Sequence, residues 1–575
     1  MSVKLCERAY VQERKACFGG KILPLIVILT FMRPALFSQG QGNAGQEILK
    51  QVEPELEQLW NEKKFDKAVT LLEELKNRPE VTGDPGSYQK VVFGLAKAQA
   101  QLGNRGKALE YLNLLRDSAE WLTAEDLKSD SSLRSLHGES GFAEILEAIE
   151  LRDNSLRLFW DSPSLKAPYR ENLSEDEKIA GLSRLWSEAK YNFVFFRRVP
   201  ELDWDAQFVK YLPRVRQTVN TAEYYRVLQQ MCALLRDGHT MVRPPKELGS
   251  TLNSAPALTT RLVDDKVLVV EVQGSDVEQQ GIQPGYEITA IDGTAVADYA
   301  RQYVVPYQSA STRQDLEVNT YQYALLRGPE DKPVQVTVRT PEGESRTVAL
   351  RRTYNPRSSS PPLEWKMLRE GIAYVTLNTF LDDNVVSLFE NSLSELKKSR
   401  ALVIDIRNNT GGKSPLALRI LSCLSDKPFL TSSWRSRKYI PAYRAWGQRE
   451  GWYEQWPSEI KPQSAIAYAK PVALLTSART YSSAEEFAAT FSTMGRGKIV
   501  GEPTGGSTGN PLRFALPGGG SALICTKHNR NPDGSEFVGV GVKPDIPVRV
   551  TIADVRAGRD PVLEAALDYL HTIVP

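Results

Sequence analysis

The chain has 575 residues, which is too long for a single hydrophobic core and suggests roughly three to five domains. Hydrophobic residues make up 41% and charged residues 25%, as in ordinary globular proteins, so the composition excludes an intrinsically disordered chain. The formal net charge is +2, and no block of like charge occurs, so nothing favours nucleic acid or an anionic membrane as a partner.

Residues 1–38 are predicted to form an export signal. The apolar run 22–32 is short for a bilayer span but has the length of a signal-peptide core, and Ala35 and Ser38 offer a cleavage site. A basic section precedes the run: Lys4, Arg8, Arg14, Lys15 and Lys21. We therefore expect a periplasmic or extracellular protein. Because Arg33 follows the run directly, an uncleaved membrane anchor is the alternative; no later segment is predicted to span a membrane.

Residues 45–155 are expected to form a helical region. Apolar residues recur there at intervals of three and four, with Gly at the breaks. The stretch GLAKAQAQLGNRGKALEYL at 94–112 resembles a tetratricopeptide unit, in which paired helices pack through small residues. A plain helical hairpin is the alternative. Either structure predicts a surface for a protein partner rather than a site of chemistry.

A second helical segment is expected over residues 173–245. It ends in LLRDGHTMV at 234–242, where Asp-Gly breaks the helix and leaves His239 just past its end. The ring could project into a cleft from this position. A lone histidine in a turn is more often a surface residue, which is the simpler interpretation.

Residues 255–355 are predicted to form a small β-rich domain. Short alternating runs of apolar and polar residues are separated there by Gly, Pro and Asp turns. The stretch GIQPGYEITAIDGTAV at 281–296 resembles part of a PDZ domain. That resemblance implies binding of an extended peptide at a sheet edge.

Residues 360–555 are predicted to form an α/β core, because apolar strand-like runs alternate with helical patterns. The late segments PGGGSALICT and FVGVGV also look like strands. The whole chain is thus predicted to be a multidomain α+β protein. Three scattered cysteines lie beyond the leader without CxxC spacing, so we expect buried free thiols: Cys232, Cys423 and Cys525. No metal or cofactor is expected.

The segment PVALLTSARTYSSAEE at 471–486 predicts a strand, a short polar turn and a helix that begins near Ser482. Such a turn would present the Ser482 hydroxyl beside the unpaired N–H groups of a helix start, which suits a nucleophile and its oxyanion. The alternative is a capping box, in which Ser482 and Glu485 only cap the helix.

A serine nucleophile needs a base, and the chain contains four histidines. His571 lies in the C-terminal tail, His137 lies in the tetratricopeptide-like region, and His528 lies in a polar loop that is predicted to face water. Elimination leaves His239 as the best base for Ser482.

A glycine turn after another predicted strand offers oxyanion donors. The sequence ALVIDIRNNTGGKS at 401–414 places Gly411 and Gly412 at the carboxyl end of a buried strand, where sites form in open α/β sheets. Their N–H groups, with that of Ser483, could form an oxyanion hole worth about 3 kcal/mol per donor. A structural glycine turn is the alternative.

The order of these motifs resembles that of peptidase family S41, the C-terminal processing proteases and tricorn core proteases, over roughly residues 174–550. The motifs are DGHT at 237–240, the PDZ-like stretch, DIRNNTGG at 405–412, TYSSAEEF at 480–487 and VGEPTGG at 500–506. The resemblance implies that Ser482 is the nucleophile, with Ser483 less favoured, and that the glycine turn and the Ser483 N–H hold the oxyanion. It also implies a serine peptidase that needs no cofactor.

One departure from the family pattern bears on the base. The processing proteases carry a lysine base 25 residues after the nucleophile, where this chain has Ser507. The tricorn-like branch uses a histidine ahead of the PDZ-like module, which maps to His239. That branch also has an orienting glutamate before a Gly-x-x-Pro-Asp stretch; the nearest acid here is Glu536, with Val538 as the alternative register.

Two alternatives to a peptidase remain open. The chain could be a non-catalytic binding protein on the same scaffold, as the retinoid-binding proteins of photoreceptors are. It could also be a scaffold protein that works through its N-terminal helices and PDZ-like module while the peptidase domain is idle.

Overall fold

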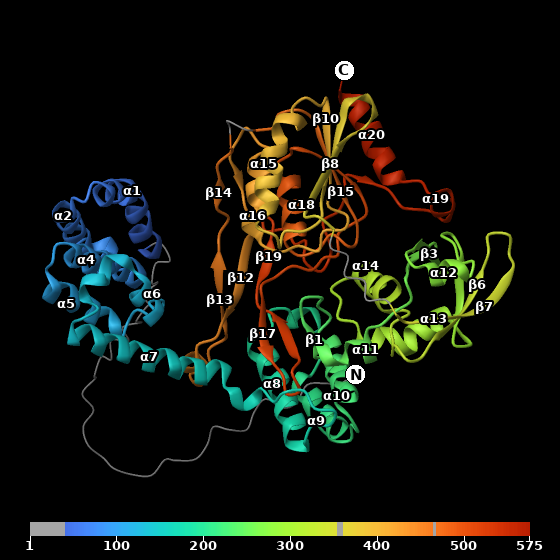
Figure 1. The fold of residues 1–575 in the computed structure, drawn as a ribbon, viewed down its shortest axis with the longest axis horizontal. Coiled ribbons are helices and arrows are strands. Elements are labelled where there is room, and N and C mark those ends of the chain that lie inside the picture. The colour runs from blue at the N-terminus through green and yellow to red at the C-terminus, as the bar shows by residue number, and fades with distance from the viewer. Residues whose placement is uncertain (1–40, 354–359, 464–466, 575) are drawn as a thin grey trace, which may run out of the picture. The chain divides into compact units, whose positions relative to one another are not determined.

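The computed structural model of the chain describes residues 41–353, 360–463 and 467–574. The described chain divides into two compact units, one ending at Trp160 and one beginning at Asp161 (Figure 1). The predicted signal segment, residues 1–38, lies outside the described residues.

The first unit is helical, as predicted. Small residues such as Ala96, Ala100 and Ala108 are buried between its helices, which lets α4 and α5 pack closely as a hairpin. The turn between these two helices contains Gly103 in a left-handed conformation with φ of +78°. The tetratricopeptide-like character of this hairpin stays a prediction. The helices are α1 Gln41–Asn61, α2 Phe65–Lys76, α3 Pro79–Thr82, α4 Pro85–Gln101, α5 Arg105–Arg116, α6 Ala124–Ser129, the 3₁₀ helix Ser131–Leu136 and α7 Ser140–Asp161.

The second unit begins with three helices, each with a polar cap: α8 Glu175–Asn192, α9 Trp204–Arg216 and α10 Thr221–Ala233. Ser174 and Glu177 form a capping box at α8, and Asp203 and Asn220 cap the next two helices through their side chains. After α10 the chain turns at Asp237–Thr240 and enters the short strand β1 Met241–Arg243. His239 therefore lies between a helix and a strand.

The β-rich region consists of antiparallel strands in the order β2-β3-β4-β6-β7, around a core of its own. Asp292 and Gly293 both have positive φ and form the tight turn between β4 and β5. The PDZ-like identity of this region stays a prediction. The strands are β2 Leu258–Val263, β3 Lys266–Val272, β4 Glu287–Ile291, β5 Thr294–Ala295, β6 Val334–Arg339 and β7 Ser345–Leu350; the helical pieces include α12 Ser275–Gln279, α13 Val296–Tyr299 and α14 Arg313–Glu317.

The central sheet has six strands in the order β20-β16-β15-β10-β9-β8, and all neighbours are parallel except β8 and β9. Every residue of β10 is buried: Leu402 and Ile404 face one core, while Ala401 and Val403 face the other. Burial on both faces explains the continuous apolar runs in the sequence. The strands are β8 Leu363–Met367, β9 Ile372–Leu377, β10 Ala401–Asp405, β15 Val472–Thr476, β16 Gly497–Gly501 and β20 Ile546–Pro547.

Helices cover both faces of this sheet, which is the α/β arrangement that the sequence predicts. Figure 1 shows α15 Asn384–Leu396, α16 Ser414–Ser422 and α18 Ser483–Thr493 along one side, and α20 Pro561–Ile573 on the other. Arg407 ties the sheet to α20, because its guanidinium pairs with Asp405 and, at 2.7 Å, with Asp560. This clamp fixes the turn that follows β10.

Smaller sheets attach the remaining segments to this core. β1 pairs with β18 Ser521–Cys525, which pairs with β17 Pro511–Ala515. A second sheet contains β12 Ser433–Lys438, β13 Gly451–Gln455 and β19 His528–Arg530, and a third pairs β11 Phe429–Leu430 with β14 Glu459–Ile460.

The prediction of a strand at FVGVGV, residues 537–542, is wrong. The segment forms a turn in which Gly539 and Gly541 have φ of +82° and +90°. Its backbone bonds instead to the loop that follows β16: Gly539 N–H donates to the Gly506 carbonyl, and Val542 N–H donates to Thr504 Oγ1. Phe537, Val538 and Val542 are therefore buried in a turn rather than in a strand, while Val540 is exposed.

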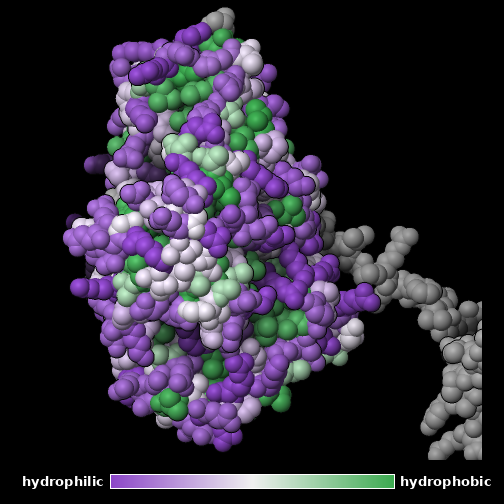
Figure 2. Space-filling model, turned by 90° about the vertical axis from the view of Figure 1, so that its right-hand side faces the viewer, coloured by the Kyte–Doolittle hydropathy of each residue, from purple (hydrophilic) through white to green (hydrophobic). Residues whose placement is uncertain are grey.

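No helix among the described residues is both long and apolar enough to cross a membrane. On the face shown in Figure 2, hydrophobic residues form small separate groups among hydrophilic ones. The predicted buried free thiols are confirmed for Cys232, Cys423 and Cys525.

Candidate active site

Ser482 lies at a strained turn between β15 and α18. Its backbone has φ of +57° and ψ of −126°, a region that residues with a side chain rarely adopt. Hydrogen bonds to the turn after β10 hold it there: Thr480 Oγ1 donates to the Ile406 carbonyl at 2.9 Å, and Tyr481 N–H donates to the Asn409 carbonyl at 3.0 Å. The strained turn holds the partly exposed Ser482 side chain just before the first residue of α18.

Ser482 and Glu485 do not form the capping box that was the alternative interpretation. The Ser482 side chain makes no capping hydrogen bond with the helix, and Glu485 is fully buried and accepts the Ser507 N–H at 3.0 Å. Burial raises the pKa of the Glu485 carboxyl well above its ordinary value. Glu485 therefore holds the Ser507 loop against the helix start instead of closing a cap.

His239 reaches this turn although it lies far from Ser482 in the sequence. Strand β1 pairs with β18, with Met241 opposite Leu523. Thr240 Oγ1 accepts the Cys525 N–H at 3.0 Å and donates to Asp237 Oδ2 at 2.7 Å. These contacts fasten the DGHT turn to the core that carries Ser482.

The two side chains meet at hydrogen-bonding distance. His239 Nε2 lies 3.0 Å from Ser482 Oγ, and His239 Nδ1 lies 2.7 Å from Ser507 Oγ. The Tyr481 ring stacks on the imidazole at an interplanar angle of 7°. If Nε2 is to accept the Ser482 proton, Nδ1 must carry the hydrogen and donate to Ser507.

The imidazole is held neutral. Burial, with a smaller effect from the positive charge of Arg243, lowers the pKa of His239 to about 4. A neutral ring with a free lone pair on Nε2 can act as a general base at neutral pH.

Ser507 is the neighbour that sequence reasoning missed. It is fully buried, and its carbonyl accepts the Ser482 N–H at 3.0 Å. The sequence did contain a signal: Ser507 stands where the processing proteases carry their lysine base. In the folded chain Ser507 lies beside Ser482, so the position of the missing lysine also indicated which residue contacts the candidate site.

The glycine turn at Gly411 and Gly412 lies against the turn that carries Ser482. A Cβ added at Gly411 would come within 2.6 Å of Ser482 Cβ, and one added at Gly412 would come within 2.2 Å of the Phe380 backbone. Gly411 N–H already donates to Asn409 Oδ1 at 2.8 Å. Within the described part of the chain, the N–H groups of Gly412 and Ser483 donate no hydrogen bond. Of the two glycines, Gly412 is thus the one with a free donor.

Glu536 contacts His528 and Arg198 rather than His239. Its carboxylate is 3.2 Å from His528 Nε2 and 3.7 Å from Arg198, and its side chain is 45% exposed. The prediction that His528 faces water is wrong: the residue is 3% exposed, and burial lowers its pKa to about 3. Val538, the alternative register, is buried and accepts a hydrogen bond from Arg198 through its carbonyl.

A buried acid outside the predicted set, Asp315 in α14, also lies near the site. Asp315 is 2% exposed, accepts the Tyr481 hydroxyl at 3.2 Å, and has a pKa raised to about 7 by burial. No sequence motif indicated Asp315, because α14 belongs to the loop-rich part of the β-rich region. No group of three or more His, Cys, Asp or Glu side chains in the described ranges is arranged to hold a metal ion.

The sequence model of peptidase family S41 matches residues 371–548, which include the Ser482 and Gly412 turns. This region of the chain is thus an S41 peptidase region by sequence. The family match and the processing-protease relatives together support a serine protease. The S41 match begins after His239, so the family model itself does not cover the imidazole.

Relatives of the S41 region include processing proteases. The chain is 25% identical over 349 residues to the chloroplastic C-terminal processing peptidase of Tetradesmus obliquus, covering 56% of this chain and 68% of that protein. It is 26% identical over 378 residues to a carboxyl-terminal-processing protease of Picosynechococcus, covering 63% and 82%. For carboxyl-terminal-processing peptidase 2 of Arabidopsis thaliana, the match spans 62% of that protein, less than two thirds of its length.

The solved structure of mature CPAF in complex with lactacystin is similar to this chain with a TM-score of 0.55 and 16% identity. The match covers 69% of this chain and 97% of that one. At this identity the likeness supports the fold alone.

Proposed function

We propose that this S41 protein hydrolyses peptide bonds through an acyl-enzyme, with Ser482 as the nucleophile and His239 as the base. The observation that carries the proposal is the 3.0 Å contact between His239 Nε2 and Ser482 Oγ. Hydrolysis of a denatured protein or a peptide by the purified chain, lost on substitution of Ser482, is the test.

In the first step, Ser482 Oγ bonds to the carbonyl carbon of the substrate while its proton moves to His239 Nε2. The carbonyl oxygen becomes an oxyanion. The carbon–nitrogen bond then breaks, and the Nε2 proton passes to the leaving amine. A water molecule then gives a proton to His239 Nε2 and attacks the acyl carbon. The bond between that carbon and Ser482 Oγ breaks, the Nε2 proton returns to Oγ, and the acid product is released.

Two backbone donors are proposed for the oxyanion, the N–H groups of Gly412 and Ser483. Both lack a partner among the hydrogen bonds of the described residues, and Ser483 begins α18, where the helix dipole favours negative charge. Gly411 contributes by its close approach to Ser482 rather than by its N–H, which Asn409 occupies.

Ser507 is proposed as a positioning residue, since its hydroxyl accepts the Nδ1 hydrogen and fixes the tautomer of His239. Ser507→Ala should lower kcat/KM by about 10- to 100-fold, the range expected for a buried donor left without its acceptor. The fall should be in kcat rather than in KM, and Ser507→Cys, which keeps a weak acceptor, should restore part of it. A rise in KM with kcat unchanged would assign Ser507 to substrate binding instead.

The pH dependence follows from the pKa of His239. A protonated ring cannot accept the Ser482 proton, so kcat/KM should fall as the pH drops through about 4, the pKa of the partly buried ring. Activity should therefore persist at pH 5.5, where an ordinary histidine would be largely protonated. The measurement is kcat/KM from pH 3.5 to 8, with circular dichroism at each pH to show that the fold persists. A fall in kcat/KM centred at pH 6.5 or above would contradict a base that is kept neutral by partial burial.

We also propose a structural role for Glu536. Because its carboxylate pairs with His528 and Arg198, Glu536 is proposed to hold the 528–538 segment rather than to orient His239 directly. Glu536→Gln should then change kcat/KM less than Ser507→Ala does.

The other regions are proposed to serve the peptidase. The β-rich region is proposed to take an extended peptide at a sheet edge, the N-terminal helices are proposed to bind a protein partner, and the leader is proposed to direct export. Comparing hydrolysis by the full chain and by a variant without residues 45–150 tests the second role; unchanged cleavage of every substrate would make that segment an accessory.

A further inference from the structure

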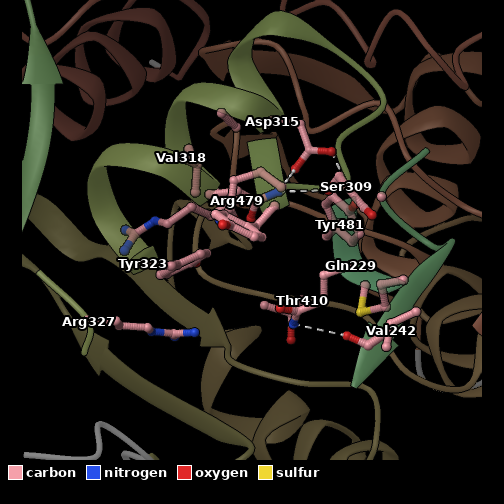
Figure 3. A pocket seen from close by; sticks show the side chains of 16 residues that line it. Gln229, Val242, Ser309, Asp315, Val318, Tyr323, Arg327, Thr410, Arg479 and Tyr481 are labelled. Atoms are coloured by element: carbon pink, nitrogen blue, oxygen red, sulfur yellow. Dashed lines mark hydrogen bonds between the residues drawn. The ribbon is translucent and has the colours of Figure 1, made fainter. Parts of the chain in front are cut away.

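A cavity of about 330 Å³ adjoins the Ser482–His239 pair. Its lining includes Gly238, Thr410 and Tyr481, which directly precede His239, Gly411 and Ser482 in the chain. Figure 3 shows Thr410 and Tyr481 facing this space together with Asp315. A group that enters the cavity therefore belongs to the part of a substrate next to the scissile bond.

Two arginines lie along this cavity without a counter-charge. Figure 3 shows Arg327, Tyr323 and Arg479 on one side of it, with Arg327 extended toward Thr410. Among the described residues, neither guanidinium has an ion pair or a hydrogen bond. Desolvation lowers the pKa of Arg479, which reflects the cost of holding its charge away from water. Arg327 stays open to solvent, so the cavity can be entered.

The acid in the cavity does not neutralise these arginines. The Asp315 carboxyl is occupied by the Ser311 N–H at 2.8 Å, Asn319 Nδ2 at 2.9 Å and the Tyr481 hydroxyl. Even with Asp315 ionised, the two arginines leave a net positive charge. A planar guanidinium without a partner is suited to bind a carboxylate through two parallel hydrogen bonds.

We propose that this cavity binds a carboxylate of the peptide substrate, with Arg327 as its main contact and Arg479 as the second. The inference rests on the proposed peptidase function, which it extends to a substrate class. The carboxylate can come from an acidic side chain beside the scissile bond or from the C-terminus of the peptide. Both sources offer the same chemistry to the arginines.

Binding tests the inference without hydrolysis. Ser482→Ala is titrated by fluorescence anisotropy with labelled peptides that differ only in one group: Glu against Gln at each position, and a free C-terminal acid against the amide. At least one acid should bind about 10-fold more tightly than its amide, and the pair that differs identifies the source. Equal affinity for every acid and its amide would overturn the proposal, whether or not the wild type proves to be a peptidase.

Substitutions assign the effect to the cavity. In the Ser482→Ala background, Arg327→Gln should remove most of the preference for the acid while leaving the affinity for the amide unchanged, and Arg327→Glu should reverse it in favour of a Lys peptide. Arg301→Gln is the matched control, because Arg301 is an exposed arginine outside the cavity, paired with Asp298. If Arg327→Gln and Arg479→Gln both keep the full preference, the carboxylate binds elsewhere and the proposal is wrong.

The experiments give different results if the carboxylate site is wrong and if the peptidase function is wrong. A wild type that cleaves acid and amide peptides with equal kcat/KM retains the proposed function and loses the inference. A wild type that cleaves neither but whose Ser482→Ala variant prefers the acid retains the carboxylate site and loses the peptidase.

Discussion

Ser482→Ala should reduce hydrolysis of a denatured protein by about 10⁴-fold or more while the protein stays folded. Removing a serine nucleophile removes the covalent route, and only the oxyanion donors and substrate binding remain. The substitution takes away one oxygen atom from a partly exposed side chain at a strained turn, so little packing is lost. The measurement is kcat/KM, with thermal unfolding to show that the fold persists.

Ser492→Ala is the control for this variant. Ser492 lies on the same helix, α18, and is exposed, so its substitution should leave kcat/KM and stability nearly unchanged. Retained hydrolysis in Ser482→Ala would sink the assignment of the nucleophile and would turn attention to Ser483, whose hydroxyl is buried without a hydrogen-bond partner in the described structure.

His239→Gln should lower kcat/KM by about 10³-fold or more. The amide nitrogen and oxygen of glutamine can occupy the space between Ser482 and Ser507, but neither can take up a proton at neutral pH. Because the serine and the imidazole act as one unit, the variant that lacks both should be no slower than Ser482→Ala alone. If the loss of kcat/KM in the double variant equalled the product of the two single losses, Ser482 and His239 would not act in the same step.

The matched control is His571→Gln, since His571 is an exposed histidine on α20 that pairs with Glu370. Its kcat/KM should stay within about twofold of the wild type. A loss as large as that of His239→Gln would mean that histidine substitutions disturb the fold rather than the base.

Much of the central fold could be predicted from the sequence, because burial on both faces leaves continuous apolar strands such as β10 and β15. The same reasoning failed at residues 537–542. There the glycines Gly539 and Gly541 turn the chain left-handed so that it can bond to the loop at 504–506. A single sequence shows which residues are apolar, but it does not show which backbone groups are already satisfied elsewhere.

The two central side chains could be proposed from sequence for different reasons. Ser482 has a local signal, a strand that runs into a helix start. His239 emerged by elimination, and what brings it to Ser482 is the pairing of β1 with β18, a contact that no local pattern predicts. Ser507 comes from a loop and Asp315 from the short helix α14, and neither segment has a periodic pattern, so only the folded chain places them beside the imidazole and Tyr481.

The proposed histidine base would distinguish this chain from the processing proteases that it resembles in sequence. With serine at position 507, the proposed proton acceptor, His239, lies in the segment ahead of the β-rich region, and the pairing of β1 with β18 holds that segment at the site. Catalysis would then depend on parts of the chain on either side of the β-rich region.

The most direct test is covalent labelling with a fluorophosphonate probe, followed by mass spectrometry of the labelled peptide. An activated serine should attack the phosphorus, and the adduct should map to Ser482 in the wild type and form far more slowly in His239→Gln. An unlabelled protein would show that this alcohol is not activated, as expected of a binding protein, and an adduct on another serine would contradict Ser482 as the nucleophile.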